Sequence, residues 1–134
     1  MKRWRKVVLS ERGIYEPKIS EEDVFKACRQ LLELNGARLF RIVERIPWGK
    51  TTSEPGLPDS FGWFPPKLIN AVDNFKSSPV HFYIEFKRPG GRLRPAQVEW
   101  LDRAREDGVI AFMADSVNCM VREFKKFGIS IKGL

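Results

Sequence analysis

The chain contains few of the residues that structural metal sites and disulfide frameworks need. It has one histidine, His81, and two cysteines, Cys28 and Cys119. A structural zinc site takes about four cysteine or histidine ligands, so this sequence excludes that kind of site. Two cysteines so far apart indicate no disulfide framework, and we therefore expect the reducing environment of the cytoplasm.

Long hydrophobic runs are also missing. No apolar stretch approaches the ~18 residues that a membrane-spanning helix needs, so we expect no membrane association. The charged start of the chain is followed only by the short apolar stretch 7–9. That stretch is too short for the apolar region of a secretory signal.

The composition is that of one folded domain with a basic surface. The 134 residues are 43% hydrophobic and 12% aromatic, which is enough to bury a core. The formal net charge is +7. Such an excess favours a polyanionic partner such as nucleic acid, although basic charge also serves solubility alone.

Hydrophobic spacing and turn residues predict an alternation of helices and strands. Residues 1–19 form a basic N-terminal arm with a short strand at 7–9. Ser20 can cap a helix, with Asp23 at the acidic position of a capping box, and Asn35-Gly36 ends it. The other expected elements are strands at 37–46, 60–64, 80–87 and 109–114, helices at 67–75, 95–108 and 116–127, and a tail or edge strand at 129–134.

The strand at 80–87 carries an acid and a base on one face. Side chains alternate along a strand, so Glu85 and Lys87 point to the same side. One interpretation is a salt bridge at a half-exposed sheet. The other is a metal-binding carboxylate with a lysine beside it, and both remain open at this point.

Three further polar residues have two interpretations each. Asp59 follows Gly56-Leu57-Pro58, either as ordinary turn chemistry or as a site residue. Glu21 shares a helix face with apolar residues, where it either complements the helix dipole or faces a site. Gln97 lies on the inward face of the helix that starts at Pro95, where it either satisfies a buried backbone group or reaches a site.

Taken together in sequence order, these residues resemble the motifs of the virus-type replication–repair nuclease (VRR-NUC) family of the PD-(D/E)XK nuclease superfamily. The resemblance covers residues 20–117 and is carried by Glu21, Gly56-Leu57-Pro58-Asp59, Glu85-Phe86-Lys87 and Arg92-Leu93-Arg94-Pro95-Ala96-Gln97. It implies an α/β fold with a restriction-endonuclease-like core, in which helices flank a central mixed β-sheet in the order α-β-β-β-α-β. The arm at 1–19 would precede a single nuclease domain at 20–134. Asp59 and Glu85 lie farther apart than is usual in the family, which suggests an insertion at 63–79.

The resemblance also implies roles for the site residues. Asp59 and Glu85 would be the main ligands of Mg²⁺ or Mn²⁺, together with the backbone carbonyl of Phe86, because hard cations prefer oxygen. Glu21 would be an additional ligand or would hold a metal-bound water. Lys87 would position or activate the attacking water, and Gln97 would orient Lys87 or that water.

Basic residues surround this motif and also lie elsewhere. Each group either binds phosphates or forms an ordinary solvated surface. The groups are Arg88, Arg92 and Arg94 beside the motif; Lys2, Arg3, Arg5 and Lys6 in the arm; and Arg122, Lys125, Lys126 and Lys132 near the C-terminus. Trp48 and Trp63 either stack on bases or pack in the core.

The function implied by the resemblance is metal-dependent DNA endonuclease activity. Small members of the family resemble Holliday-junction resolvases that act as homodimers on branched DNA, and the chain would act in the cytoplasm, where a virus- or phage-encoded enzyme would also work. Two alternatives remain: a nuclease or nickase of other specificity in replication or repair, and a nucleic-acid-binding module without activity.

Overall fold

The computed structural model describes residues 8–10, 13–15, 18–42, 54–66 and 78–133. The elements in these ranges are β1 (Val8–Ser10), β2 (Gly13–Tyr15), α1 (Glu21–Leu34), β3 (Arg38–Arg41), β4 (Ser60–Phe64), β5 (Val80–Phe86), α2 (Pro95–Glu106), β6 (Ile110–Ala114) and α3 (Val117–Lys126).

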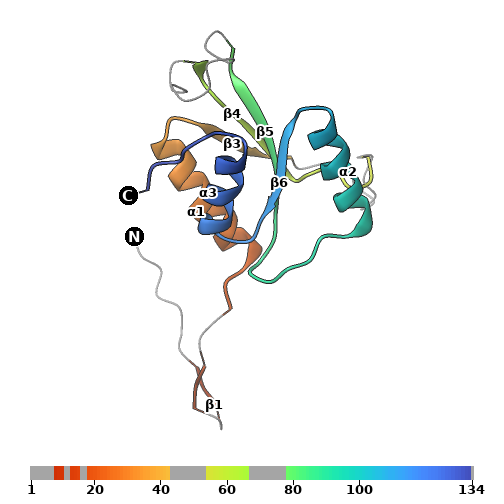
Figure 1. Cartoon of the computed structure of the whole chain (residues 1–134). Coiled ribbons are helices and arrows are strands. Elements are labelled where there is room, and N and C mark those ends of the chain that lie inside the picture. Colours follow the sequence, from red (N-terminus) through yellow and green to blue (C-terminus); the bar gives the residue numbers. More distant parts are fainter. Residues whose placement is uncertain (1–7, 11–12, 16–17, 43–53, 67–77, 134) are drawn as a thin grey trace, which may run out of the picture.

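The central element is a mixed four-stranded sheet in the order β3-β4-β5-β6. The first two pairings are antiparallel, and β5 and β6 are parallel and joined through α2. Figure 1 shows α1 and α3 on one face of the sheet and α2 on the other. This confirms the predicted α/β class with a mixed sheet between helices, consistent with a restriction-endonuclease-like core.

The start of α1 has the capping box that the sequence predicts. The Ser20 hydroxyl accepts a hydrogen bond from the Asp23 backbone N–H at 3.1 Å, and the Asp23 carboxylate accepts one from the Ser20 N–H at 2.9 Å. Gly36 follows the helix with a φ of 82°, a conformation that favours glycine. The helix therefore begins and ends at residues that local chemistry specifies.

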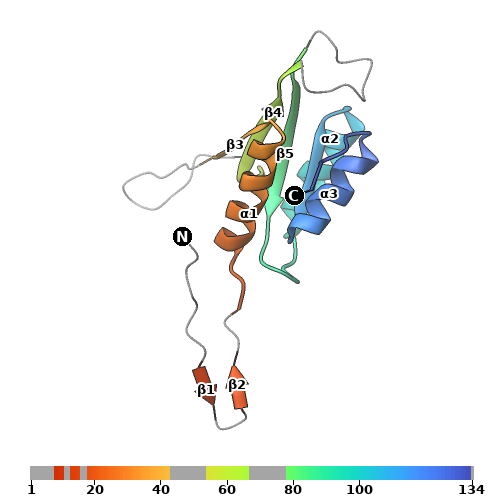
Figure 2. The ribbon, with the colours of Figure 1, turned by 90° about the vertical axis from the view of Figure 1, so that its left-hand side faces the viewer.

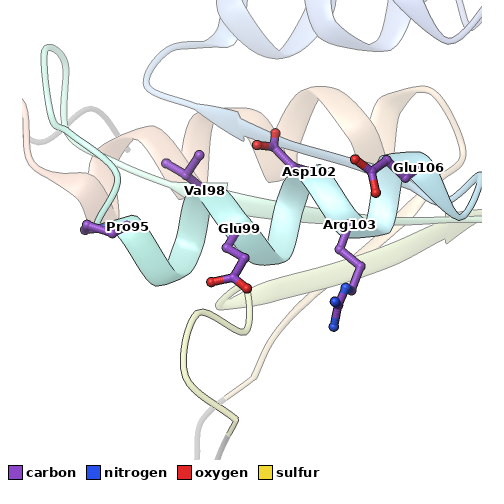
Figure 3. A pocket seen from close by; sticks show the side chains of 6 residues that line it. All are labelled: Pro95, Val98, Glu99, Asp102, Arg103 and Glu106. Carbon is purple, nitrogen blue, oxygen red and sulfur yellow. The ribbon is translucent and has the colours of Figure 1, made fainter.

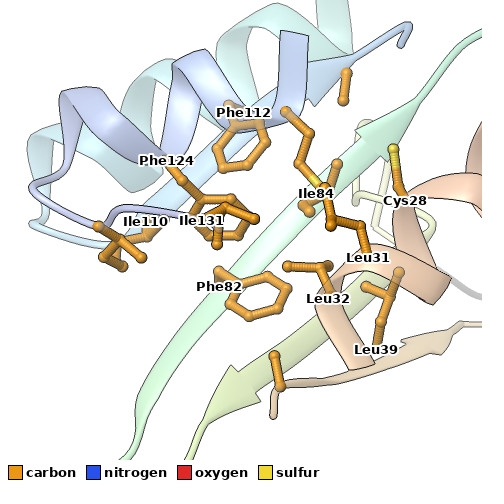
Figure 4. Close-up of a cluster of buried hydrophobic side chains, with 14 of the residues drawn as sticks. Cys28, Leu31, Leu32, Leu39, Phe82, Ile84, Ile110, Phe112, Phe124 and Ile131 are labelled. Carbon is orange, nitrogen blue, oxygen red and sulfur yellow. The ribbon is translucent and has the colours of Figure 1, made fainter. Parts of the chain in front are cut away.

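The larger core lies between the sheet and the α1–α3 layer. The side chains of β5 alternate, so Phe82, Ile84 and Phe86 face this layer and are fully buried. Phe82 and Phe112 both contact Phe124 edge-on, with ring centroids 5.0 and 4.9 Å apart. Figure 4 shows these rings meeting side chains of α1. The packing fixes the faces of β4 and β5 and therefore where their polar residues point.

Several elements differ from the sequence-based expectation. Strand β3 covers 38–41, and the Ile42 N–H just after it donates to the Asp59 carbonyl at 2.6 Å. Residues 43–46 of the strand expected at 37–46 lie outside the described residues. The strand expected at 80–87 ends at Phe86. The arm strand expected at 7–9 is β1, and it pairs with β2, which the sequence analysis missed. The expected helix at 67–75 lies outside the described residues.

The C-terminal segment is an extended tail rather than an edge strand. Ile129 and Ile131 are buried in the larger core. The Asn35 side chain donates to the Lys132 carbonyl at 3.0 Å and accepts from its N–H at 2.9 Å. The tail is thus held against the end of α1, which explains why it does not join the sheet.

Two further observations concern the cysteine thiols and membrane-spanning helices. Cys28 and Cys119 are both free and buried. Burial raises the pKa of the Cys28 thiol to about 12. None of the helices in the described ranges has the length and apolar content that crossing a membrane requires.

Candidate active site

Two carboxylates meet at the end of the sheet where β4 begins and β5 ends. The Asp59 N–H donates to Glu85 Oε2 at 3.0 Å. In return, the Phe86 N–H donates to Asp59 Oδ1 at 3.3 Å. Each acid is therefore held by the backbone of the strand that carries the other. The structure brings the two predicted metal ligands together although they are distant in sequence.

The second Glu85 oxygen faces α2 and Lys87. Gln97 Nε2 donates to Glu85 Oε1 at 2.8 Å. Lys87 Nζ lies 3.5 Å from the same oxygen. Gln97 Oε1 accepts from the Arg94 N–H at 2.8 Å, which fixes the amide orientation. Gln97 thus contacts Glu85, whereas the resemblance assigns it to Lys87 or the water.

The environment favours the neutral form of both acids. Glu85 is only 5% exposed. Burial, followed by the nearby Asp59 carboxylate, raises the pKa of Glu85 to about 7. Burial likewise raises the pKa of Asp59, although the Phe86 N–H, Arg41 and other neighbours oppose this change. Two mutually repelling carboxylates, one buried and one half-buried, are an arrangement that an additional positive charge would stabilise.

Arg41 is a functional residue that the sequence analysis missed. Its Nη1 lies 2.8 Å from Glu22 Oε2, and its Nη2 lies 3.8 Å from Glu21 Oε2. The same Nη2 lies 4.0 Å from Asp59 Oδ2. The guanidinium also sits over the Phe25 ring, 4.4 Å from its centroid. Arg41 therefore links the first turn of α1 to Asp59.

The hydrogen bonding of Arg41 is incomplete. Its Nε and Nη2 atoms are buried and make no hydrogen bond within the described structure. Strand alternation could have identified it, since Leu39 faces the core and Arg41 lies two positions later on the same face. The sequence alone does not indicate what this arginine does, because Asp59 and the first turn of α1 come close to it only in the folded chain.

Gly56 lets the loop before β4 pass close to the start of α2. It has a φ of +85°, and a Cβ added there would lie 2.1 Å from the Ala96 carbonyl oxygen. Only glycine fits both conditions. The Gly56-Leu57-Pro58-Asp59 turn and the helix that carries Gln97 are therefore packed directly against each other.

The remaining predicted residues are placed less closely. Glu21 contacts Arg41, and its side chain is 43% exposed. The predicted phosphate-binding residues Arg88, Arg92 and Arg94 are exposed on the connection from β5 to α2. The predicted arm residues Lys2, Arg3, Arg5 and Lys6 lie outside the described residues, as does Trp48. The basic residues of the C-terminal group, Arg122, Lys125, Lys126 and Lys132, belong to α3 and the tail, in the layer opposite α2.

A hollow along the outer side of α2 lies away from the acids. Figure 3 shows its lining, all from one helix: Pro95, Val98, Glu99, Asp102, Arg103 and Glu106. Gln97, which reaches Glu85, points to the other side of the helix. Three carboxylates and one arginine make this hollow a poor surface for a phosphate chain.

The donor set at the sheet end fits a hard divalent cation in its chemistry. Asp59 and Glu85 offer oxygen, and Asp59 Oδ2 has only Arg41 near it, at 4.0 Å, among the contacts of the described part. The described residues contain no group of three or more His, Cys, Asp or Glu arranged to hold a metal. Glu21, the third predicted ligand, lies 3.8 Å from the same Arg41 Nη2 atom that is 4.0 Å from Asp59 Oδ2.

Comparison with known proteins identifies a family for the chain. The profile of the VRR-NUC domain matches residues 1–118. No curated protein matches the chain. A VRR-NUC domain implies a nuclease of the PD-(D/E)XK type with DNA as substrate, and such nucleases generally use divalent metals. Since the match spans most of the 134 residues, the chain belongs to the VRR-NUC family.

Proposed function

We propose that the protein is a Mg²⁺- or Mn²⁺-dependent DNA endonuclease that cuts branched DNA. The observation that carries the proposal is the convergence of Asp59, Glu85, Lys87 and Gln97 at one end of the sheet, with every link 3.5 Å or shorter. A structural salt bridge would account for Glu85 and Lys87, but not for a second, half-buried acid and a glutamine at the same carboxylate.

Lys87 is suited to act on the attacking water and the phosphate. Its side chain is 14% exposed, so the ammonium group is sheltered but reachable. A positive donor in such a site is more effective than in bulk water because the local dielectric is low. Lys87 would hold the water by hydrogen bonding and balance the negative charge that develops on the phosphate.

Gln97 serves as a positioning residue. Its amide donates to the Glu85 oxygen that Lys87 also approaches, and its own oxygen is fixed by the Arg94 N–H. This chain of contacts holds Glu85 in one rotamer. The acid and the lysine would then keep a constant separation while substrate enters.

Asp59, Glu85 and the Phe86 carbonyl would hold the divalent cation, with Glu21 as an outer ligand. When bound, the cation would supply charge neutralisation at the phosphate and make deprotonation of water easier. Arg88, Arg92 and Arg94 would contact the neighbouring phosphates, since all three are exposed close to this end of the sheet.

The preference for branched DNA and the dimeric state are parts of the same proposal. A four-way junction is two-fold symmetric, and resolving it takes two cuts. One set of acids and lysine per chain provides one cut, so a symmetric homodimer matches the substrate.

The test is cleavage of four-way junction, flap, duplex and single-stranded DNA with Mn²⁺ or Mg²⁺. We expect junction DNA to be cut fastest, and Lys87→Ala to lower the rate by at least about 100-fold. Lys26→Ala is the matched control, because Lys26 is an exposed lysine on α1 that belongs to none of the predicted DNA-binding groups, and it should cut at the wild-type rate. Absence of cleavage on all four DNAs, or equal rates for Lys87→Ala and wild type, would refute the proposal.

A further inference from the structure

A row of aromatic rings crosses the face of the sheet that carries α2. We call Phe40, Phe61, Trp63 and His81 the aromatic row. Phe40 lies 5.5 Å from Phe61 and 5.3 Å from Trp63 between ring centroids. Trp63 lies 6.2 Å from His81. The rings come from β3, β4 and β5, so they form one continuous strip across neighbouring strands.

The aromatic row is not covered by α2. This helix packs over β5 and β6, where Trp100 meets Tyr83 edge-on at 5.4 Å. Figure 2 shows α2 on the β6 side, away from β3 and β4. Phe40 is 37% exposed, His81 is exposed, and Phe61 and Trp63 are half-buried. A shallow hollow lies at Phe61, Trp63 and His81.

The aromatic row is continuous with the candidate active site. Phe61 and Trp63 follow Asp59 by two and four positions along the chain, which places them roughly 7 and 13 Å from it along the strand. His81 precedes Glu85 by four positions on the same face of β5. A DNA strand bound with a phosphate at the two acids could therefore continue over the rings within a few nucleotides.

The charge around the aromatic row also fits DNA. Arg38 is exposed and pairs with Trp63 across β3 and β4, so its side chain belongs to the same face. Rings for stacking beside a cation for phosphate are the two components of single-strand binding surfaces. In a symmetric contact between two copies, the exposed Arg38 side chains would add like charge to a small patch. A stable interface needs about 800 Å² per partner with an apolar centre, and charged residues are depleted there.

We propose that the aromatic row stacks on unpaired bases of the DNA substrate and so binds a single-stranded segment next to the cut. The inference rests on the proposed function in taking DNA as the ligand. It gives the endonuclease a reason to prefer branched DNA, because bases at a branch or flap are free to stack whereas bases within a duplex are not.

The test is binding by fluorescence anisotropy in a buffer with chelator and no divalent metal. The probes are a labelled thymidine dodecamer and an abasic strand of the same length, which has the same phosphates but no bases. We expect wild-type protein to bind the thymidine strand on the order of tenfold more tightly than the abasic strand. Phe40→Leu and Trp63→Leu should lose most of this preference and keep their affinity for the abasic strand.

Two variants serve as controls. Phe40→Tyr retains a ring and should retain the preference. Leu34→Ala alters a 59% exposed apolar residue on α1 and should change neither affinity. Thermal melting of each variant verifies folding, and the exposed position of Phe40 makes its replacements the safer pair.

The outcomes separate this inference from the proposed function. An equal affinity of wild type for both strands, or a preference that both leucine variants keep, would overturn it. So would leucine variants that keep the preference and instead turn a dimer into a monomer by light scattering, since the rings would then join two copies. Because no metal is present, base-dependent binding without any cleavage activity would leave the inference standing and refute only the proposed function.

Discussion

Glu85 makes the stability of the native state depend on pH. Its pKa is about 7 in the folded protein, above the ordinary glutamate value, because of burial and then of Asp59. Below the unfolded pKa both states are protonated and Glu85 has no effect. As the pH rises toward 7, the unfolded state loses its proton first, so stability falls.

We therefore expect wild type to lose up to about 3 kcal/mol of unfolding free energy between pH 5 and pH 8 through this residue. Glu85→Gln should remove this slope. Urea unfolding of both proteins in chelator at the two pH values measures the difference, with Glu99→Gln as an exposed control. Parallel slopes for wild type and Glu85→Gln would show that Glu85 is ionised in both states.

Arg41 compensates the negative charge of three carboxylates. Arg41→Met leaves Asp59 and the first turn of α1 without this cation, and we expect a loss of about 1–3 kcal/mol. Added Mn²⁺ should raise the melting temperature of Arg41→Met more than that of wild type, since the ion replaces the missing charge. Arg29→Met, at an exposed pair within α1, is the control and should respond like wild type. Equal Mn²⁺ responses of all three proteins would argue against a role of Arg41 at the acids.

At the scale of elements, the turn before β4 and the start of α2 behave as one unit. Gly56→Ala brings a methyl group against the Ala96 carbonyl, so the turn must move away from the helix. Gly108→Ala is the matched control, because Gly108 has the same φ of +85° and no atom within 4 Å of the added carbon.

Both variants should lose about 1–2 kcal/mol, since alanine is strained at positive φ, and Gly56→Ala should lose more because its turn must also move. Only Gly56→Ala should also lose cleavage, by at least about tenfold, because it separates Asp59 from Gln97. Thermal melts report the loss of stability, and cleavage rates measured on the same preparations report whether the turn has been displaced from α2. Similar rates for the two variants would mean that the contact with α2 does not position the site.

Helices and strands could be predicted from the sequence where neighbouring residues determine where they begin and end. Ser20 and Asp23 specify the start of α1, and Asp59 and Pro65-Pro66 bound β4. The strand predicted at 37–46 contains β3, and its part at 43–46 lies outside the described residues. Arg41 was missed because its role comes from groups on α1 and beside β4. Glu85 and Lys87 were recognised because a charged pair within an apolar strand is visible in the sequence.

At the scale of the whole molecule, the homodimer proposal predicts how mixed proteins behave. With excess Lys87→Ala protein, most dimers that contain a wild-type chain hold only one functional lysine. A supercoiled plasmid with a cruciform should then be nicked rather than linearised, as gel electrophoresis would show. Linear product in proportion to the wild-type protein would instead indicate that each chain cuts independently.

In the antiparallel register of β4 and β5, the two acids and the connection between these strands lie at opposite ends of the strand pair. Ser60 faces Ile84 at the end that bears the acids, and Phe64 faces Val80 at the opposite end, where the chain leaves the sheet. The distance between Asp59 and Glu85 is therefore set by strand pairing and not by the number of residues between them. For protein engineering, this connection is a place to graft a reporter or a targeting domain, because a longer or shorter link there leaves the cutting end of the sheet unchanged.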